Sequence, residues 1–161
     1  MTAKAVDAGT LTFDAVTDAI GYIAENLRDA DKAELTAAFG AIPDVSEFLY
    51  DVWEASAQSW IVLDRTGLPI AIFGVTGLTP EVGFAWFLGT DGVTDEWVAI
   101  ARQTPKFIRR MHELFPTLYT NVDARNDITV HWLSAAGFTL SDADPAYGPE
   151  GRLFLQFVRT S

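Results

Sequence analysis

The stretch that decides the fold is "DARNDITVHWLSAAGF", residues 123–138. It has the pattern of a short helix, because Asn126 is of a type favoured just before a first turn and Gly137 of a type favoured just after a last turn. The preceding residues, "TLYTNVDA", favour a strand. Further upstream, "EVGFAWFLG" predicts another strand, and "TDEWVAIARQTPKFIRRMHELF" predicts a helix that Pro105 kinks or splits. This strand–helix–strand unit, from Phe84 to Val122, predicts two parallel strands.

The remaining segments predict a mixed sheet. "SWIVLDRTGLPIAIFGVTGL" predicts two strands joined by a turn at residues 65–67, and "GRLFLQFVRT" predicts a last strand after the loop "DADPAYGPEG". Towards the N-terminus, "LTFDAV" is a possible first strand. Three helices follow, starting at Thr17 or Asp18, at Asp31 with Glu34 in capping-box spacing, and at Asp44. We therefore expect a tail over residues 1–10 and a single α+β domain over residues 11–161, in which helices flank the sheet.

The composition is that of a globular protein with a strongly acidic charge. The 161 residues are 49% hydrophobic and include no cysteine, which excludes disulfides and cysteine-bound metals. Twenty-two Asp and Glu against eleven Lys and Arg give a net charge of −11, which disfavours nucleic acid and anionic membranes as partners. No apolar run reaches the roughly 18 residues of a membrane span, and the first residues lack the apolar segment of a signal peptide. We expect a soluble intracellular protein.

The order of elements, with "ARN" opening a helix and "GF" closing it, resembles the GNAT (Gcn5-related N-acetyltransferase) fold over roughly residues 59–158. The longer stretch from "WFLGTDGV" to "LSAAGF" is similar to the small GNAT-like proteins of T7-type podophages. The T7 member of that group is an internal virion or virion-assembly protein. The resemblance implies that the two parallel strands splay at their C-terminal ends. It also implies phage or host proteins as partners, and the host cytoplasm during infection, or the virion, as the location.

In GNAT enzymes, the loop between the first parallel strand and the long helix holds the pyrophosphate of coenzyme A. The resemblance places the cofactor contacts of this chain at Leu88, Gly89, Gly92, Val93 and Asn126. The matching loop, "LGTDGVTDEW", carries three carboxylates and no Arg or Gln. One carboxylate about 5 Å from a phosphate charge costs roughly 3 kcal/mol at an effective dielectric near 20. A helix dipole contributes only about 0.3–1 kcal/mol.

A second departure concerns the proton donor. Many GNAT enzymes have a Tyr four residues before the closing Gly as the general acid, and here that position is Leu133. We therefore expect no cofactor, or acetyl-CoA if the protein is an enzyme, bound more weakly than about 100 μM.

The candidate catalytic residues are carboxylates near the ends of the strands that flank the expected cleft. Glu81 and Asp123 are the candidates for a general base that deprotonates an amine substrate, and Asp91 is a further one. Each carboxylate alone is also compatible with a solvated surface position, and Asn126 with a helix cap. His112 and His131 lack a second ligand at metal-binding spacing, so we predict no metal site.

Cations cluster on the long helix. Helical spacing places them on one flank, where they are candidates for binding an acidic protein partner: Arg102, Lys106, Arg109 and Arg110. A solvated helix face is the alternative, and nucleic acid is unlikely because aromatic residues are scarce among them.

The resemblance implies a phage-encoded GNAT-like protein that acts in virion assembly or as an internal virion protein, and the altered cofactor loop and proton-donor position favour a non-enzymatic one. Two alternatives stay open. One is an acetyl-CoA-dependent N-acetyltransferase that acts on a protein or a small amine, and the other is an acidic binding module that blocks a host factor. The sequence leaves the oligomeric state open.

Overall fold

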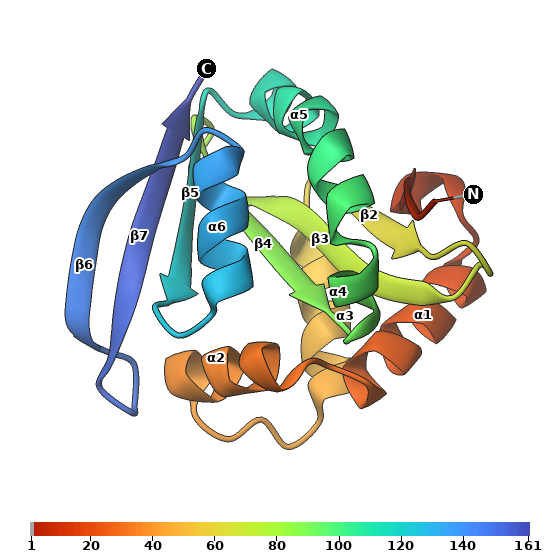
Figure 1. Ribbon diagram of the computed structural model, residues 1–161, viewed down its shortest axis with the longest axis horizontal. Helices are drawn as coiled ribbons and strands as arrows, with labels where there is room; N and C mark the ends of the chain where they lie inside the picture. The colour runs from red at the N-terminus through yellow and green to blue at the C-terminus, as the bar shows by residue number, and fades with distance from the viewer. Residues whose placement is uncertain (1) are drawn as a thin grey trace.

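The computed structural model describes residues 2–161. They form one seven-stranded sheet in the order β1-β2-β3-β4-β5-β7-β6 (Figure 1). Neighbouring strands pair antiparallel, except β4 and β5, which pair parallel. The strands are β1 (Lys4–Asp7), β2 (Gln58–Leu63), β3 (Pro69–Gly77), β4 (Val82–Gly89), β5 (Thr117–Asp123), β6 (Thr139–Tyr147) and β7 (Arg152–Thr160). This mixed sheet confirms the predicted α+β class.

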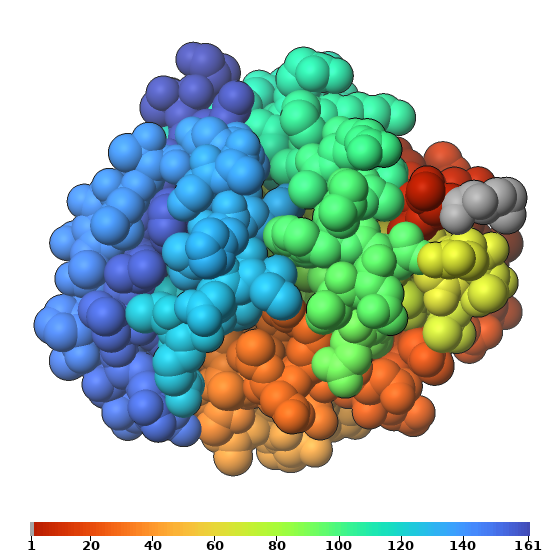
Figure 2. Space-filling model, viewed as in Figure 1, coloured from red at the N-terminus to blue at the C-terminus, as the bar shows by residue number. Residues whose placement is uncertain are grey.

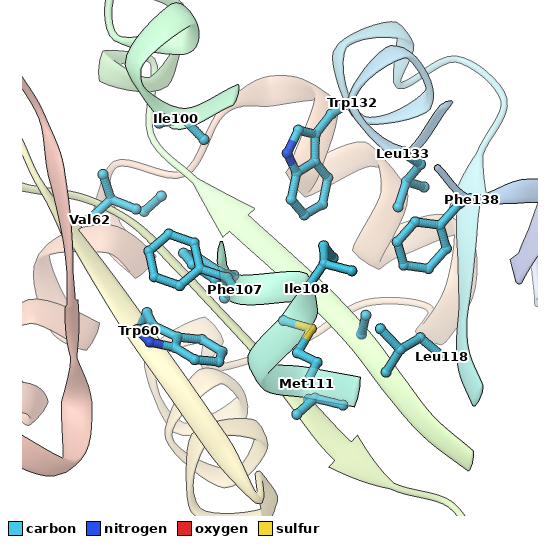
Figure 3. Close-up of a cluster of buried hydrophobic side chains, with 14 of the residues drawn as sticks. Trp60, Val62, Ile100, Phe107, Ile108, Met111, Leu118, Trp132, Leu133 and Phe138 are labelled. Atoms are coloured by element: carbon cyan, nitrogen blue, oxygen red, sulfur yellow. The ribbon is translucent and has the colours of Figure 1, made fainter. Parts of the chain in front are cut away.

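Helices cover both faces of the sheet. Successive side chains of a strand point to opposite faces, so the apolar residues of one strand can pack against helices on both sides. Trp60 and Val62 of β2 belong to one buried cluster with α5 and α6, whereas Ile61 belongs to a second cluster with α1 and α3 (Figures 1 and 3). The helices are α1 (Phe13–Glu25), α2 (Asp29–Phe39), α3 (Val45–Ala55), α4 (Gly92–Asp95), α5 (Trp97–Leu114) and α6 (Asp127–Ala135), with a short 3-10 helix, η1 (Ala8–Thr10).

The parallel strands β4 and β5 touch only at their N-terminal ends. Their pairing runs from Val82 and Thr117 to Phe84 and Tyr119 and then stops. Beyond that point β4 stays paired with β3, and β5 stays paired with β7. The predicted parallel pairing and the predicted splay are both confirmed. The splay leaves a gap whose two edges are main chain. The helix α2 lies at the open end of this gap (Figure 1), and in the space-filling view its orange atoms fill the space below the light-blue atoms of α6 and the green atoms of α4 (Figure 2).

Two predicted helix ends are confirmed. Asp44 precedes α3, and its side chain accepts a hydrogen bond from the Glu47 N–H at 3.1 Å. Gly137 follows α6 with φ 88°, and the Phe138 N–H reaches back to the Leu133 carbonyl at 3.0 Å. Glycine suits this position because a side chain strains the left-handed conformation.

The predicted strand "LTFDAV" is wrong, because Thr12 caps α1 and the helix begins at Phe13. The Thr12 hydroxyl accepts a hydrogen bond from the Ala15 N–H at 3.1 Å, so Thr17 and Asp18 lie inside the helix. The N-terminal strand is instead β1, which lies within the residues expected to form a tail and pairs with β2.

Two further predictions also need correction. The expected loop "DADPAYGPEG" contains the second half of β6, an edge strand whose mostly exposed side chains give no apolar alternation. The expected long helix is divided at Glu96 into α4 and α5, whereas Pro105 lies inside α5 without ending it.

The close packing of β4 against the helix layer predicts a large effect of one methyl group. A Cβ at Gly83 would lie 2.6 Å from ring carbon Cδ2 of Phe115 and 2.6 Å from a methyl of Val75. We expect Gly83→Ala to lower the free energy of unfolding by about 1–3 kcal/mol in urea denaturation. Gly21→Ala is the matched control, since nothing lies within 4 Å of its Cβ. It should stabilise α1 by about 0.5–1 kcal/mol, and equal effects of the two changes would contradict the packing argument.

Candidate functional site

A cavity of about 520 Å³ lies where β4 and β5 separate. Residues 84–88 of β4 form one wall and Thr120 and Asn121 of β5 form another, while α2, α3 and α6 supply most of the rest. Phe39 and Leu78 line the cavity and are also exposed, so they mark its opening. Most of the lining side chains are aromatic or aliphatic. The cavity therefore suits an apolar molecule.

Glu34 of α2 is the ionisable group that stands out in this cavity. Its Oε1 accepts a hydrogen bond from the Asp123 N–H at 2.7 Å. Removal from water raises the pKa of Glu34 to about 8, and the charges of Asp31 and Asp123 add to the rise. Hydrogen bonds from Asp123 and Asn126 oppose it without cancelling it. At neutral pH, Glu34 is mostly protonated and close to its titration point.

Sequence reasoning missed Glu34 as a site residue, because its spacing from Asp31 is that of a capping box. In the structure α2 begins at Asp29, and neither side chain caps it. A cue was present in the sequence: Asp31 and Glu34 lie on the same helix face as Leu35, so two carboxylates point towards the protein interior.

A buried network joins α2 to the end of β4 and to the start of α6. The Arg28 guanidinium donates to both carboxylate oxygens of Asp31, at 2.8 and 3.1 Å. The same carboxylate accepts the Gly89 N–H at 2.9 Å and the Asn126 side-chain amide at 3.1 Å. Arg28, Asp31 and Asn126 are all buried. Removing one partner of a buried ion pair leaves an uncompensated charge, which strongly destabilises the fold.

Asn126 stands at the N-cap position of α6, as expected, but its side chain makes no capping bond. Its amide nitrogen donates to Asp31, and its oxygen accepts from Arg28 at 3.3 Å. The interpretation of its side chain as a helix cap is therefore wrong. Both polar atoms of the Asn126 side chain, which was expected to contact the cofactor, are therefore hydrogen-bonded to Asp31 and Arg28.

The two predicted catalytic carboxylates are not brought together. Glu81 is exposed in the turn before β4, at the end opposite the splay. Asp123 ends β5 and is buried, and its carboxylate binds the Arg125 guanidinium, with one contact at 2.6 Å. Burial alone would raise the pKa of Asp123, but hydrogen bonds from the Arg125 side chain and backbone lower it. Neither side chain lines the cavity. Their catalytic roles stay predictions.

Three N–H groups of the expected phosphate loop already have acceptors within the chain. The Gly89 N–H is bound by Asp31, the Gly92 N–H by the Thr90 hydroxyl at 3.2 Å and the Val93 N–H by the Thr90 carbonyl at 3.1 Å. A phosphate nest needs N–H groups that are free to point at the anion. These three N–H groups therefore do not fit a pyrophosphate.

Packing explains why the loop contains glycines. A Cβ at Gly89 would lie 2.6 Å from a methyl of Val93, and one at Gly92 would lie 2.7 Å from a methyl of Ile70. Leu88 and Val93 are both buried, Val93 in the core. The carboxylates of Asp91 and Asp95 are exposed beside this loop.

Binding of acetyl-CoA would therefore depend on its pantetheine arm. Beyond Phe84 and Tyr119, the edges of β4 and β5 no longer pair with each other. An extended chain fits between two such edges as an added strand would. The unpaired stretch of the two edges, short of the ends bound by Asp31 and Glu34, matches the amide groups of this arm, whereas the three bonded N–H groups of the loop do not fit the phosphates.

The wall formed by α6 contains no acid at the position expected for a proton donor. Leu133 is buried and lines the cavity. Beside it, the indole N–H of Trp132 donates to the Thr104 hydroxyl of α5 at 2.7 Å, and its ring lies 5.5 Å from that of Phe87. Trp132 thus bridges α5 and α6 above β4 (Figure 3). The cavity does contain a phenol at another position. Tyr147 of β6 lines it, and the Tyr147 hydroxyl oxygen lies 3.5 Å from the Asn121 amide nitrogen.

The predicted cationic stripe lies on α5, away from the cavity. All four side chains are exposed: Arg102, Lys106, Arg109 and Arg110. Arg110 is paired with Glu113 and donates to Gln58 at 2.7 Å. A partner role for the stripe stays a proposal.

Within residues 2–161, no group of three or more His, Asp or Glu side chains could hold a metal ion. No helix in this part of the chain is long and apolar enough to span a membrane.

No protein-family model and no curated protein matches the chain. Solved structures do. One is a GNAT-superfamily phosphinothricin acetyltransferase from Sinorhizobium meliloti in complex with acetyl-CoA, with TM-score 0.75, 16% identity, and 99% of this chain and 89% of that chain covered. Ard1 from Thermoplasma volcanium gives TM-score 0.71 at 9% identity, with coverage of 99% and 98%. Spermidine N-acetyltransferase from Vibrio cholerae, in complex with CoA and spermine, gives TM-score 0.64 at 10% identity, with coverage of 99% and 95%.

These likenesses establish the fold, which is that of the GNAT acetyltransferases. The expected GNAT resemblance is therefore confirmed at the level of the fold. Nothing in the comparisons links the chain to the virion proteins of T7-type podophages.

The raised pKa of Glu34 makes stability depend on pH. Between the ordinary value of 4.5 and about 8, the unfolded chain loses this proton while the folded chain keeps it. Stability should therefore fall as pH rises through that window. We expect the melting temperature of Glu34→Gln, relative to wild type, to increase by several degrees between pH 5 and pH 9. Glu25→Gln, an exposed control on α1, should show no such trend. Parallel curves for Glu34→Gln and wild type would contradict the assignment.

The two faces of α5 should respond differently to substitution. Reversing Arg102, Lys106 and Arg109 to Glu should change the free energy of unfolding by less than about 1 kcal/mol, because exposed charges contribute little. Phe107→Ala, on the buried face of the same helix, should cost about 3–5 kcal/mol. Chemical denaturation measures both. A large loss from the charge reversals would show that the stripe supports the fold.

Proposed function

We propose that the protein is an N-acetyltransferase that moves an acetyl group from the thioester acetyl-CoA to the primary amine of an apolar acceptor. One observation carries the proposal: a carboxyl group with a pKa near 8, Glu34, faces an apolar cavity at the splay of β4 and β5. The shared fold supports it, since two of the similar structures hold acetyl-CoA or CoA.

The residues of the chain supply acid–base chemistry and placement. Glu34 in its ionised form would accept a proton from the acceptor amine as that amine becomes acylated. The hydrogen bond from the Asp123 N–H fixes one carboxyl oxygen of Glu34 at 2.7 Å. Bound acetyl-CoA would supply the activated acyl group: its acyl C–S bond breaks as the C–N bond forms, and the proton that the amine loses balances the thiol that leaves. This arrangement assigns the role of base to Glu34, in place of Glu81 and Asp123.

The cavity walls define the class of acceptor. Its volume of about 520 Å³ falls in the range of roughly 300–1,000 Å³ that is typical of small-molecule sites. Phe84 and Trp86 of β4 and Phe48 of α3 supply aromatic surface. The apolar part of an acceptor would pack on these rings, which directs its amine to the polar residues of the cavity.

A second candidate function is favoured by the loop between β4 and α4, because three of its N–H groups are already hydrogen-bonded within the chain. A GNAT-fold protein that holds an apolar ligand or partner segment without catalysis would need the cavity and no pyrophosphate contact. The virion-assembly role expected from the sequence belongs to this class. The two functions differ in one measurable respect, which is release of free thiol from the donor.

The proposed base predicts a pH-dependent rate. With a panel of aromatic and aliphatic amines, kcat/KM for thiol release from acetyl-CoA should rise with pH and level off above about 8, because Glu34 must be ionised. Glu34→Gln should lower kcat by about 10²–10⁴-fold and abolish this pH dependence. Glu25→Gln is the control for the loss of one carboxylate. Full activity of Glu34→Gln would remove the proposed base, and the absence of turnover with every amine would favour the non-catalytic function.

A further inference from the structure

We infer that this site recognises its thioester donor through the pantetheine arm and not through the pyrophosphate. The inference rests on the proposed function and specifies which part of the donor the chain binds. It follows from three features of the residues around the splay, which are the hydrogen bonds of the loop, the charges beside it and the free strand edges.

The first feature is that three N–H groups of the loop, including those of both glycines, already have acceptors. The N–H groups of Gly89, Gly92 and Val93 are bound by Asp31 and by two oxygens of Thr90. The Thr90 N–H is bound by the Ile70 carbonyl at 2.8 Å. A phosphate could reach these groups only by displacing acceptors, of which the Asp31 carboxylate is buried and paired. Such a displacement would leave the Arg28 charge without its partner.

The second feature is the sign of the charge beside the loop. Asp91 and Asp95 are exposed there and repel phosphate. Two cations lie near this loop, and each of them is paired with a carboxylate. Arg28 is bound to Asp31, and Arg65 lies 3.5 Å from the Glu96 carboxylate. The total charge of −11 acts in the same direction.

The third feature is the pair of strand edges between the paired residues Phe84 and Tyr119 and the strand ends. The ends themselves are occupied by α2, because Asp31 binds the Gly89 N–H and Glu34 binds the Asp123 N–H. The arm of the donor is uncharged and carries amide groups, which match the stretch of main chain before these ends, where β4 and β5 do not pair with each other. The apolar cavity begins at the same place, so an acyl group at the end of the arm would come to lie near Glu34. Affinity for the donor should therefore reside in the arm.

The decisive experiment compares the dissociation constants of S-acetylpantetheine and acetyl-CoA by isothermal titration of the full chain. We expect the two constants to agree within about threefold, because the phosphates gain no net attraction. Acetyl-CoA binding more than threefold tighter overturns the inference and leaves the proposed function standing. If neither thioester binds at millimolar concentration, the inference and the proposed function both fail.

Ionic strength gives a second measurement on the same samples. Between about 50 and 500 mM salt, the affinity for acetyl-CoA should stay constant or rise, because salt screens the repulsion between the donor and an acidic protein. The affinity for S-acetylpantetheine should not respond. A fall in acetyl-CoA affinity with salt would reveal a cationic phosphate site and overturn the inference.

Two double variants distinguish the effect of the loop carboxylates from the effect of the net charge of the protein. Asp91→Lys with Asp95→Lys should favour acetyl-CoA over S-acetylpantetheine by about tenfold, since it places cations where the phosphates would pass. Asp14→Lys with Asp18→Lys makes the same change in net charge on α1, where both side chains are exposed. This control should leave the preference unchanged. Equal shifts in the two variants would overturn the role assigned to the loop carboxylates.

Discussion

The buried carboxylate of Asp31 is the contact on which the arrangement of the site depends. It accepts two hydrogen bonds from Arg28, one from Asn126 and one from the Gly89 N–H, so it joins α2, β4 and α6. These elements surround the place where β4 and β5 have stopped pairing with each other. Without a polar contact of this kind, the N–H at the end of β4 would be buried and unsatisfied. The network thus closes one end of the gap and leaves the cavity beside it.

The same network sets the chemistry of Glu34. One helical turn separates Asp31 from Glu34, so the anchor of α2 also fixes the position of the carboxyl group that lines the cavity. The negative charge of Asp31 contributes to the raised pKa of Glu34, after the larger effect of burial. A buried ion pair and a carboxyl group of raised pKa are therefore coupled through a single helix. Substitutions of Asp31 would affect both the buried ion pair and the pKa of Glu34, whereas Glu34→Gln removes the titrating group and leaves the ion pair in place.

Most of the fold followed from local patterns. The crossover from Phe84 to Val122 required a parallel pair, and Gly137 marked the end of α6. The start of α1 did not follow, because "LTFDAV" alternates as a strand does. Phe13 is 60% exposed there and lies against Tyr50 and Trp53 of α3, which only the tertiary structure reveals.

The site was harder to predict than the fold. Its contacts join residues far apart in the chain: Asn126 and Asp31 are 95 positions apart, and Gly89 and Asp31 are 58 positions apart. Glu34 and Asp123 are likewise 89 positions apart. Local spacing therefore suggested two helix caps, at Asp31 and Asn126, where the folded chain forms one buried network.

The loop between β4 and α4 shows why the same glycines supported two different interpretations. A Gly beside a helix start is needed where a phosphate approaches the backbone, and it is equally needed where a neighbouring side chain does. Here Val93 and Ile70 occupy that space. The splay, in contrast, follows from topology, because β5 pairs with β7 along its full length while β4 follows β3. A chain can therefore have the gap between β4 and β5 while the N–H groups of both loop glycines are bound within the chain. The gap and the loop are separable parts of the GNAT fold, and the fold alone specifies only the first.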